Sequence, residues 1–197
     1  MSTERAYHHG NLRSALLSRA EQTVREHGVP ALSLRELARD VGVSHGAPRR
    51  HFPDRRALLD ALAERSFERL GDELQAAVDG AGPGFDARLQ ALAHAYVAFA
   101  TRDAALLELM FASKHRDGAD GTRASAERAF AIPLTVIAAA QQDAAVVAGD
   151  PEALARVAFA TLHGLATMAN GEMLGDDDLG AIVTDAVERL LAGLRPR

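Results

Sequence analysis

The spacing of apolar residues constrains this chain more than any other feature, because almost every segment repeats them at the period of an α-helix. Leu34, Leu37, Ala38 and Val41, for example, lie at positions i, i+3, i+4 and i+7, and therefore on one face of a helix. No stretch alternates apolar and polar residues as a half-buried β-strand does. The sequence therefore predicts an all-α fold of about nine helices, at about residues 11–27, 33–41, 44–51, 54–79, 85–101, 103–114, 122–148, 151–170 and 178–194.

The composition argues against several classes of protein. The chain has 197 residues and no cysteine, which excludes disulfides, zinc–thiolate centres and thiol catalysis. It has no uncharged apolar run of about 18 residues, the length that a membrane-spanning helix needs. The opening segment MSTERAYHHG is polar and lacks the apolar core of a signal peptide, so we expect a cytoplasmic protein.

Charge is distributed unevenly along the chain, although the net charge is only −5. Residues 1–56 contain ten arginines and six acidic residues, a balance of +4, so the remainder of the chain carries −9. A basic N-terminal part on an acidic body is typical of a protein that approaches nucleic acid with one part only. We expect a DNA-binding domain at residues 1–52 and a second domain at residues 53–197.

One segment within the basic part has the pattern of two short helices joined at a tight turn. Ser33 and Glu36 form a capping box at the start of the first helix, the small Ala38 lets a second helix cross closely, and Gly42 tolerates the positive φ of a sharp turn. The second helix, SHGAPRRH at residues 44–51, is nearly all polar, small or basic and has little to bury. This pattern predicts a helix-turn-helix whose second helix enters the major groove of DNA. An ordinary helix pair in an all-α core is the alternative.

The same segment resembles the signature of the tetracycline-repressor-like (TetR) family of transcriptional regulators. The matching residues, within about residues 10–60, are Ala38, Gly42, Val43, Ser44, Gly46, His51, Phe52, Arg55, Leu58 and Leu59. Arg49 stands where the family usually has tyrosine, Arg55 stands where it usually has lysine, and Pro48 is unusual. The resemblance implies an all-helical homodimer that acts as a repressor on a palindromic operator and is released by a small-molecule effector.

Two further motifs resemble a narrower subgroup of the TetR family. The first runs from Tyr7 to Arg13, and the second runs from Phe159 to Leu165. The subgroup often carries Trp-x-x-x-His-Gly in its penultimate helix, and here Phe159 takes the place of the tryptophan ahead of His163.

Nine residues are candidates for DNA contacts, namely Ser33, Ser44, His45, Gly46, Ala47, Arg49, Arg50, His51 and Arg55. The start of the second helix favours phosphate, so we expect Ser44 on the DNA backbone, and Arg55 is placed to hold a flanking phosphate. His45, Ala47, Arg49 and Arg50 are the candidates for base edges, because arginine binds guanine with two hydrogen bonds and alanine can contact a thymine methyl group. Which of the two arginines reads a base stays open.

The second domain offers candidates for a ligand pocket and for a dimer interface. The pocket candidates are Phe67, Leu70, Leu92, Tyr96, Phe99, Leu109, Met110, Phe111, Phe130, Ile137 and His163. Most are apolar, with Tyr96 and His163 as polar anchors, so the pattern predicts a small hydrophobic effector; ordinary core packing is the alternative for each. The last two helices carry the clearest apolar stripes, and the resemblance places the dimer interface there. The interface candidates are Leu154, Val157, Ala158, Thr161, Leu162, Leu165, Ile182, Val183, Ala186 and Leu190.

No pattern in the chain indicates an enzyme, a cofactor or a metal site. The loop at residues 80–84 does not follow a strand as a phosphate-binding loop does, and no G-x-S-x-G motif occurs. The pairs His8/His9 and His45/His51 do not have the i, i+4 spacing that places two metal ligands on one helix face. The alternatives to a DNA-binding regulator are a structural or interaction protein on the same helical scaffold, and an enzyme of unrecognised chemistry.

Overall fold

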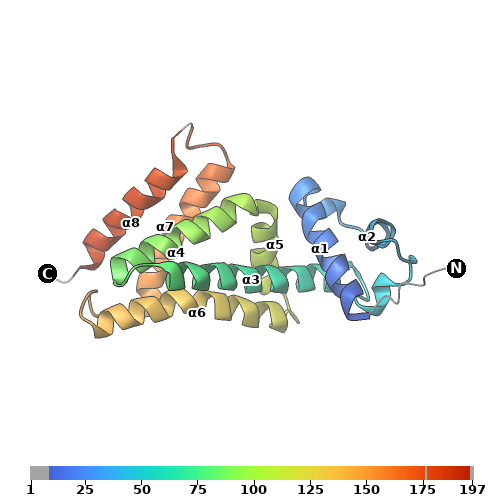
Figure 1. The fold of residues 1–197 in the computed structure, drawn as a ribbon, viewed down its shortest axis with the longest axis horizontal. Coiled ribbons are helices and arrows are strands. Elements are labelled where there is room, and N and C mark those ends of the chain that lie inside the picture. Colours follow the sequence, from blue (N-terminus) through green and yellow to red (C-terminus); the bar gives the residue numbers. More distant parts are fainter. Residues whose placement is uncertain (1–8, 176, 196–197) are drawn as a thin grey trace. The chain divides into compact units, whose positions relative to one another are not determined.

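A computed structural model describes residues 9–175 and 177–195 of the chain, and all regular structure in this part is helical. The eight α-helices are α1 (His9–His27), α2 (Leu34–Val41), α3 (Arg55–Gly80), α4 (Phe85–Arg102), α5 (Ala104–Lys114), α6 (Asp120–Gln142), α7 (Pro151–Asn170) and α8 (Leu179–Leu194), shown in Figure 1. Two 3₁₀ turns, Val29–Ala31 and Pro48–Arg50, lie on either side of α2. The all-α prediction is confirmed. None of these helices is long and apolar enough to cross a membrane.

The chain forms two compact units. Unit 1 comprises residues up to Ser66 together with Ala105–Arg123, and unit 2 comprises Phe67–Ala104 together with the chain from Ala124 onward. The helices α3 and α6 therefore each contribute residues to both units. The two compact units do not coincide with the domains expected at residues 1–52 and 53–197. Those domains were assigned by function, and their boundary stays a prediction.

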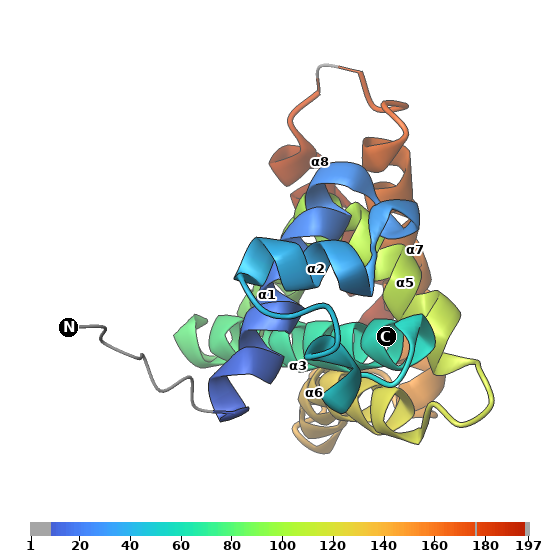
Figure 2. The ribbon, with the colours of Figure 1, turned by 90° about the vertical axis from the view of Figure 1, so that its right-hand side faces the viewer.

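Unit 1 is organised around one apolar core. The apolar faces of α1 and α3 supply most of it, and α2 packs against α1, as Figure 2 also shows. The buried members of this core are Leu12, Leu16, Leu17, Ala20, Val24, Leu32, Leu37, Phe52, Leu58, Leu59, Leu62, Ala63, Leu106 and Leu109. An acidic side chain, Glu21, is also buried in unit 1, where its carboxylate accepts a hydrogen bond from Arg25 Nη2 at 2.6 Å.

The helix expected at residues 44–51 is wrong in detail. Residues 44–47 are not helical: His45 and Gly46 form a turn, and only Pro48–Arg50 form a single 3₁₀ turn. An α-helix that starts at Ser44 needs the amide of residue 48 as a donor, and Pro48 has no amide hydrogen. The chain uses shorter bonds instead: the amide of Ala47 donates to the Ser44 oxygen at 3.0 Å, and that of Arg50 donates to the Ala47 oxygen at 3.2 Å.

The helix expected at 122–148 also ends earlier than the apolar pattern indicated. The helix α6 stops at Gln142, and Ala144 has a positive φ of 54°. The side chain of Gln141 then donates from Nε2 to the carbonyl oxygens of Val147 at 3.0 Å and Gly149 at 3.1 Å. Val146 is buried in this loop, so its apolar character reflects a packed connection rather than a further helical turn.

Unit 2 is built around α4, which packs against both α7 and α8 (Figure 1). The buried faces of these helices are rich in alanine and leucine, which allow close approach between helix axes. The carboxylates of Asp150 and Asp178 cap α7 and α8, accepting bonds from the amides of Glu152 at 3.0 Å and Gly180 at 2.9 Å.

The residue that ends α2 leads to a testable prediction. Gly42 has φ 76° and ψ 32°, a left-handed conformation that costs other residues about 1–2 kcal/mol. A Cβ at Gly42 would meet no atom within 4 Å, so Gly42→Ala should destabilise the fold through backbone strain alone. We expect a loss of about 1 kcal/mol in urea unfolding. The control is Gly46→Ala, where φ is not positive and a Cβ also meets no atom within 4 Å; equal losses in both variants would contradict the prediction.

Candidate DNA-binding surface and ligand-binding region

The turn after α2 is sharp because Gly42 ends the helix and the chain immediately reverses. The amide of Val43 donates to the Ala38 oxygen at 2.9 Å, and Ala38 and Leu37 are buried against the core of unit 1. The following residue, Ser44, is exposed. The local sequence therefore anchors residues 44–51 through the buried Pro48 and leaves Ser44, His45, Gly46, Arg49 and Arg50 exposed, as a helix-turn-helix requires.

Most of the DNA-contact candidates lie on the exposed surface of unit 1. Ser44, His45, Gly46, Arg49 and Arg50 are exposed, whereas Ser33, Ala47 and His51 are partly buried. In the described part of the chain, neither Arg49 nor Arg50 has an acidic partner. Two guanidinium groups without a carboxylate partner form a surface suited to an anionic ligand such as the DNA backbone.

The capping role expected for Ser33 is not formed by its side chain. Ser33 has extended φ and ψ at the N-terminus of α2, but its hydroxyl makes no capping hydrogen bond. The cap of α3 differs, because the Asp54 carboxylate accepts a bond from the Ala57 amide at 2.8 Å.

Arg55 has a role that the sequence did not reveal. Its Nε donates to the Leu32 oxygen at 3.0 Å and its Nη2 donates to the Val29 oxygen at 2.6 Å. The side chain therefore ties the first turn of α3 to the 3₁₀ turn before α2, through partners 23 and 26 residues away in the sequence. A phosphate contact by Arg55 stays a prediction, and it would have to use the remaining N–H groups.

Arg13 is a basic residue of this surface that the sequence reasoning did not select. It is exposed on α1, and its guanidinium lies 5.5 Å from the centre of the Phe52 ring. Phe52 directly follows the candidate residue His51 in the sequence. A cavity of about 260 Å³ is lined by Arg13, His51 and Phe52 together. No local pattern could have found this position, because Arg13 and Phe52 meet only when α1 packs in unit 1.

An aromatic cluster occupies part of unit 2. Tyr96, Phe159 and His163 meet there: the Tyr96 and Phe159 ring centres lie 5.4 Å apart, and Phe159 stacks on His163 at 5.3 Å. Phe130 contacts Phe159 edge to face at 5.3 Å and Phe67 at 6.2 Å. We call these five residues the aromatic cluster. It joins residues of α3, α4, α6 and α7, and four of the five, all except Phe159, are among the pocket candidates of the sequence analysis.

The polar contact in the aromatic cluster joins its two polar members. Tyr96 Oη lies 2.8 Å from His163 Nδ1, at hydrogen-bond distance. Burial raises the pKa of Tyr96 well above its ordinary value, so the phenol stays protonated. The cluster therefore contains one hydrogen-bonded polar pair set among aromatic faces.

The structure does not bring all the pocket candidates together. Leu109 belongs to the core of unit 1, and Met110 and Phe111 also lie in the residues assigned to unit 1. Leu70, Leu92 and Ile137 are buried in unit 2, and Phe99 is covered by cations, with Arg69 and Arg102 at 5.0 and 5.6 Å from its ring.

The interface candidates on α7 and α8 differ in exposure. Ala158, Leu162 and Val183 are buried within the chain. Leu154, Thr161, Leu165, Ile182, Ala186 and Leu190 are partly buried. Val157, in contrast, is 59% exposed, and the nearby large apolar residues Met168 and Met173 are 39% and 62% exposed.

A short helix that ends at a glycine, followed by an exposed basic turn, has the pattern of a helix-turn-helix transcription regulator. Two family models match the chain: "Bacterial regulatory proteins, tetR family" over residues 16–62, and "Tetracyclin repressor-like, C-terminal domain" over residues 89–194. The second match alone covers more than half of the chain. The protein belongs to the TetR family of bacterial transcription regulators, which are not enzymes. The narrower subgroup stays a prediction, and Tyr7 and His8 of its motif lie outside the described residues.

Solved structures share this fold. A protein of unknown function from Rhodococcus sp. RHA1 is 45% identical, with a TM-score of 0.92 over 98% of this chain and 100% of that chain. A protein of Mesorhizobium loti MAFF303099 assigned to the TetR family is 18% identical, with a TM-score of 0.78 over 95% and 98% of the two chains. The transcriptional regulator FadR from Bacillus subtilis, in complex with stearoyl-CoA, is 14% identical, with a TM-score of 0.74 over 92% and 99%. No curated protein matches the chain.

Proposed function

We propose that the protein is a homodimeric repressor that binds a palindromic operator and releases it when a small hydrophobic effector binds in unit 2. The observation that carries the DNA-binding part is the pair Arg49 and Arg50, exposed after the Gly42 turn with no acidic partner in the described chain. Ser44 and His45 are exposed in the same segment, so side chains suited to phosphates and to base edges lie together.

The experiment measures operator affinity for Arg49→Ala and Arg50→Ala. A palindromic duplex is first selected from a random pool with the wild-type protein, and its affinity is then followed by fluorescence anisotropy at several salt concentrations. Replacing the arginine that reads a base should reduce the discrimination between bases at one operator position by about 1–3 kcal/mol. Replacing the arginine that holds phosphate should weaken binding to all duplexes. It should also reduce the slope of log affinity against log salt concentration by about one.

The control for the two arginine variants is Arg189→Ala, in unit 2, where the guanidinium pairs with Asp185 at 2.7 Å. This variant should bind the operator as the wild-type protein does. If Arg49→Ala and Arg50→Ala also bind as wild type, the assignment of residues 44–51 to DNA is wrong. If the wild-type protein selects no duplex, the alternative of an interaction protein on this scaffold gains support.

Effector release is supported by the aromatic cluster and by the course of α3. Phe67 of the cluster belongs to α3, and the same continuous helix begins at Arg55 in unit 1. A ligand that repacks the cluster would therefore act on a helix that both units share. It shifts the protein only to the extent that it binds the two states with different affinity. FadR, with a similar fold, holds stearoyl-CoA, which makes a long-chain acyl-CoA a reasonable first probe.

The effector prediction concerns the polar pair of the cluster. Tyr96→Phe keeps the ring and removes the hydroxyl that faces His163. We expect operator binding without effector to stay within about twofold of wild type, while the effector concentration for half-release rises about tenfold, the loss of roughly one hydrogen bond. Candidate effectors, stearoyl-CoA first, are screened for a rise in the melting temperature of the protein. Those that bind are then titrated into the protein–operator complex. Release requires that effector binding lowers the operator affinity. An effector that binds but leaves the operator affinity unchanged would therefore contradict the release mechanism.

A further inference from the structure

The helix-turn-helix segment begins and ends at points that lie next to each other in unit 1. The chain enters it from the 3₁₀ turn Val29–Ala31 and leaves it at Arg55, the first residue of α3. Arg55 bridges these two ends, because its Nε donates to the Leu32 oxygen at 3.0 Å and its Nη2 donates to the Val29 oxygen at 2.6 Å. Residues 33–54, which include α2 and the exposed turn after it, therefore form a loop that one guanidinium group closes at its base.

The backbone at both ends of this bridge is anchored. Leu32 is buried in the core of unit 1, and Val29 packs against the same core. The Val29 oxygen also accepts a bond from the Leu32 amide at 3.2 Å, so both acceptors of Arg55 belong to one hydrogen-bonded turn. At the other end, the Asp54 carboxylate accepts a bond from the Ala57 amide at 2.8 Å and caps α3 where Arg55 begins it. The bridge therefore joins two fixed stretches of backbone.

The geometry of the bridge depends on the arginine side chain. Nε and one Nη lie on the same edge of the planar guanidinium, so this rigid fork can donate to two acceptors at once. A lysine carries a single nitrogen on a flexible stem and has no such fork. Lysine at position 55 would therefore keep the positive charge but lose the paired geometry. This difference separates a positioning role of Arg55 from a simple charge contact with DNA.

We propose that Arg55 is a positioning residue for operator recognition, which acts through the two carbonyl groups by holding the base of the loop 33–54 closed; this role rests on the proposed DNA-binding function. A closed base presents Arg49 and Arg50 in one orientation. An open base lets the loop adopt several orientations, and the apparent affinity falls with the fraction of molecules that fits the operator. Binding to unrelated DNA depends on charge and much less on orientation.

The first test is Arg55→Lys in the full-length protein, with two duplexes compared by fluorescence anisotropy: the operator selected by the wild-type protein and a random-sequence duplex of equal length. Operator affinity should fall about tenfold, as it does when about one tenth of the molecules keep the binding orientation. The affinity for the random duplex and its salt dependence should stay as in the wild type, because the charge is kept. A phosphate contact predicts instead that Arg55→Lys binds both duplexes as the wild type does, and that result would overturn the proposal.

The matched pair Arg55→Gln and Arg56→Gln provides the control. Both arginines are exposed in the first turn of α3, but Arg56 donates to the Asp117 oxygen and not to the turn before α2. Only Arg55→Gln should lower the ratio of operator affinity to random-duplex affinity, again about tenfold. A loss of stability reduces the active fraction for both duplexes equally, so this ratio does not respond to a merely structural role. Equal ratios in the two variants would overturn the proposal.

Hydrogen exchange tests the bridge without DNA. In Arg55→Lys, the amides of residues 33–54 should exchange at least about threefold faster than in the wild type, because the loop opens more often, while those of α8 in unit 2 stay unchanged. Unchanged exchange at residues 33–54 would overturn the proposal. If exchange rises but the wild-type protein selects no duplex, the DNA-binding function fails and the recognition role of Arg55 fails with it. If the wild type selects an operator that Arg55→Lys binds equally well, only the positioning role fails.

Discussion

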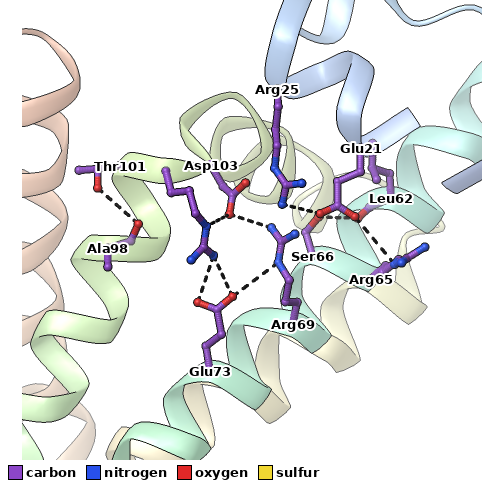
Figure 3. A network of polar contacts seen from close by, with 11 residues as sticks. Glu21, Arg25, Leu62, Arg65, Ser66, Arg69, Glu73, Ala98, Thr101 and Asp103 are labelled. Carbon is purple, nitrogen blue, oxygen red and sulfur yellow. Dashed lines mark hydrogen bonds and ion pairs between the residues drawn. The ribbon is translucent and has the colours of Figure 1, made fainter. Parts of the chain in front are cut away.

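Replacing Asp103 by alanine should destabilise the protein by about 3 kcal/mol, because a buried carboxylate then no longer compensates two cations. The Asp103 side chain is 0% exposed at the corner between α4 and α5. Its Oδ2 accepts bonds from Arg69 Nη2 and from Arg102 Nε, each at 2.9 Å. Figure 3 shows Asp103 pointing toward Arg69 of α3, with Glu73 of the same helix close by.

The size of this effect follows from burial. Breaking a fully buried ion pair by removing one partner costs about 3–5 kcal/mol. Arg69 is 27% exposed and Arg102 is 50% exposed, and Arg102 keeps its bonds to Glu73 at 2.8 and 3.1 Å, so water and Glu73 compensate part of the loss. We therefore place the expected value at the lower end of that range.

Urea unfolding at one fixed protein concentration measures the loss for Asp103→Ala. At this size a loss of 3 kcal/mol corresponds to roughly 6–12 °C in the melting temperature. The control is Asp185→Ala, whose carboxylate makes an exposed ion pair with Arg189 at 2.7 Å, so this variant should leave the stability nearly unchanged. If both variants lose the same stability, Asp103 has no special role at this corner.

Replacing Val157 by glutamate should separate the dimer and reduce operator affinity by about 10²–10⁴-fold. Val157 is 59% exposed on α7, an unusual position for a large apolar side chain, and Met168 and Met173 are exposed on the same helix and just after it. We expect these exposed apolar residues to belong to the surface that the partner copy covers. A charge on this surface would have to lose its water when the two copies meet.

The loss of affinity follows from the geometry of a palindrome. A dimer contacts two half-sites about 34–36 Å apart, and a monomer contacts only one. Val157 is exposed, so the variant should keep its helical circular dichroism and its urea midpoint at low protein concentration. Leu162→Glu is the contrasting variant: Leu162 is 7% exposed within the chain, so a charge there should unfold the protein instead.

Light scattering coupled to size-exclusion chromatography measures the assembly state, and anisotropy measures operator binding. A monomeric wild-type protein at about 10 μM would contradict the dimer, as would a Val157→Glu variant that stays dimeric. The avidity argument requires that dimerisation strengthens DNA binding. A variant that is monomeric yet binds the operator with full affinity would therefore contradict it.

The sequence by itself determined the features that depend on neighbours along the chain. Helical periodicity reflects contacts between residues three and four apart, so the all-α fold and the approximate course of the helices could be predicted. The left-handed turn at Gly42 is equally local, since it depends on the absence of a Cβ at one residue. The caps at Asp54 and Asp178 are local too, since each carboxylate accepts from an amide two or three positions away. The lack of an α-helix at residues 44–51 was also available locally, because Pro48 lacks the necessary donor.

Only the tertiary structure decided which distant residues meet. Arg55 binds carbonyl oxygens 23 and 26 positions away, Tyr96 meets His163 across 67 positions, and Asp103 accepts a hydrogen bond from Arg69, 34 positions away. Leu109, which the apolar pattern grouped with a ligand pocket, belongs instead to the core of unit 1. Periodicity shows which face of a helix is apolar, but the packing of whole helices determines which partner that face covers, and that packing is a sum over contacts that no local pattern contains.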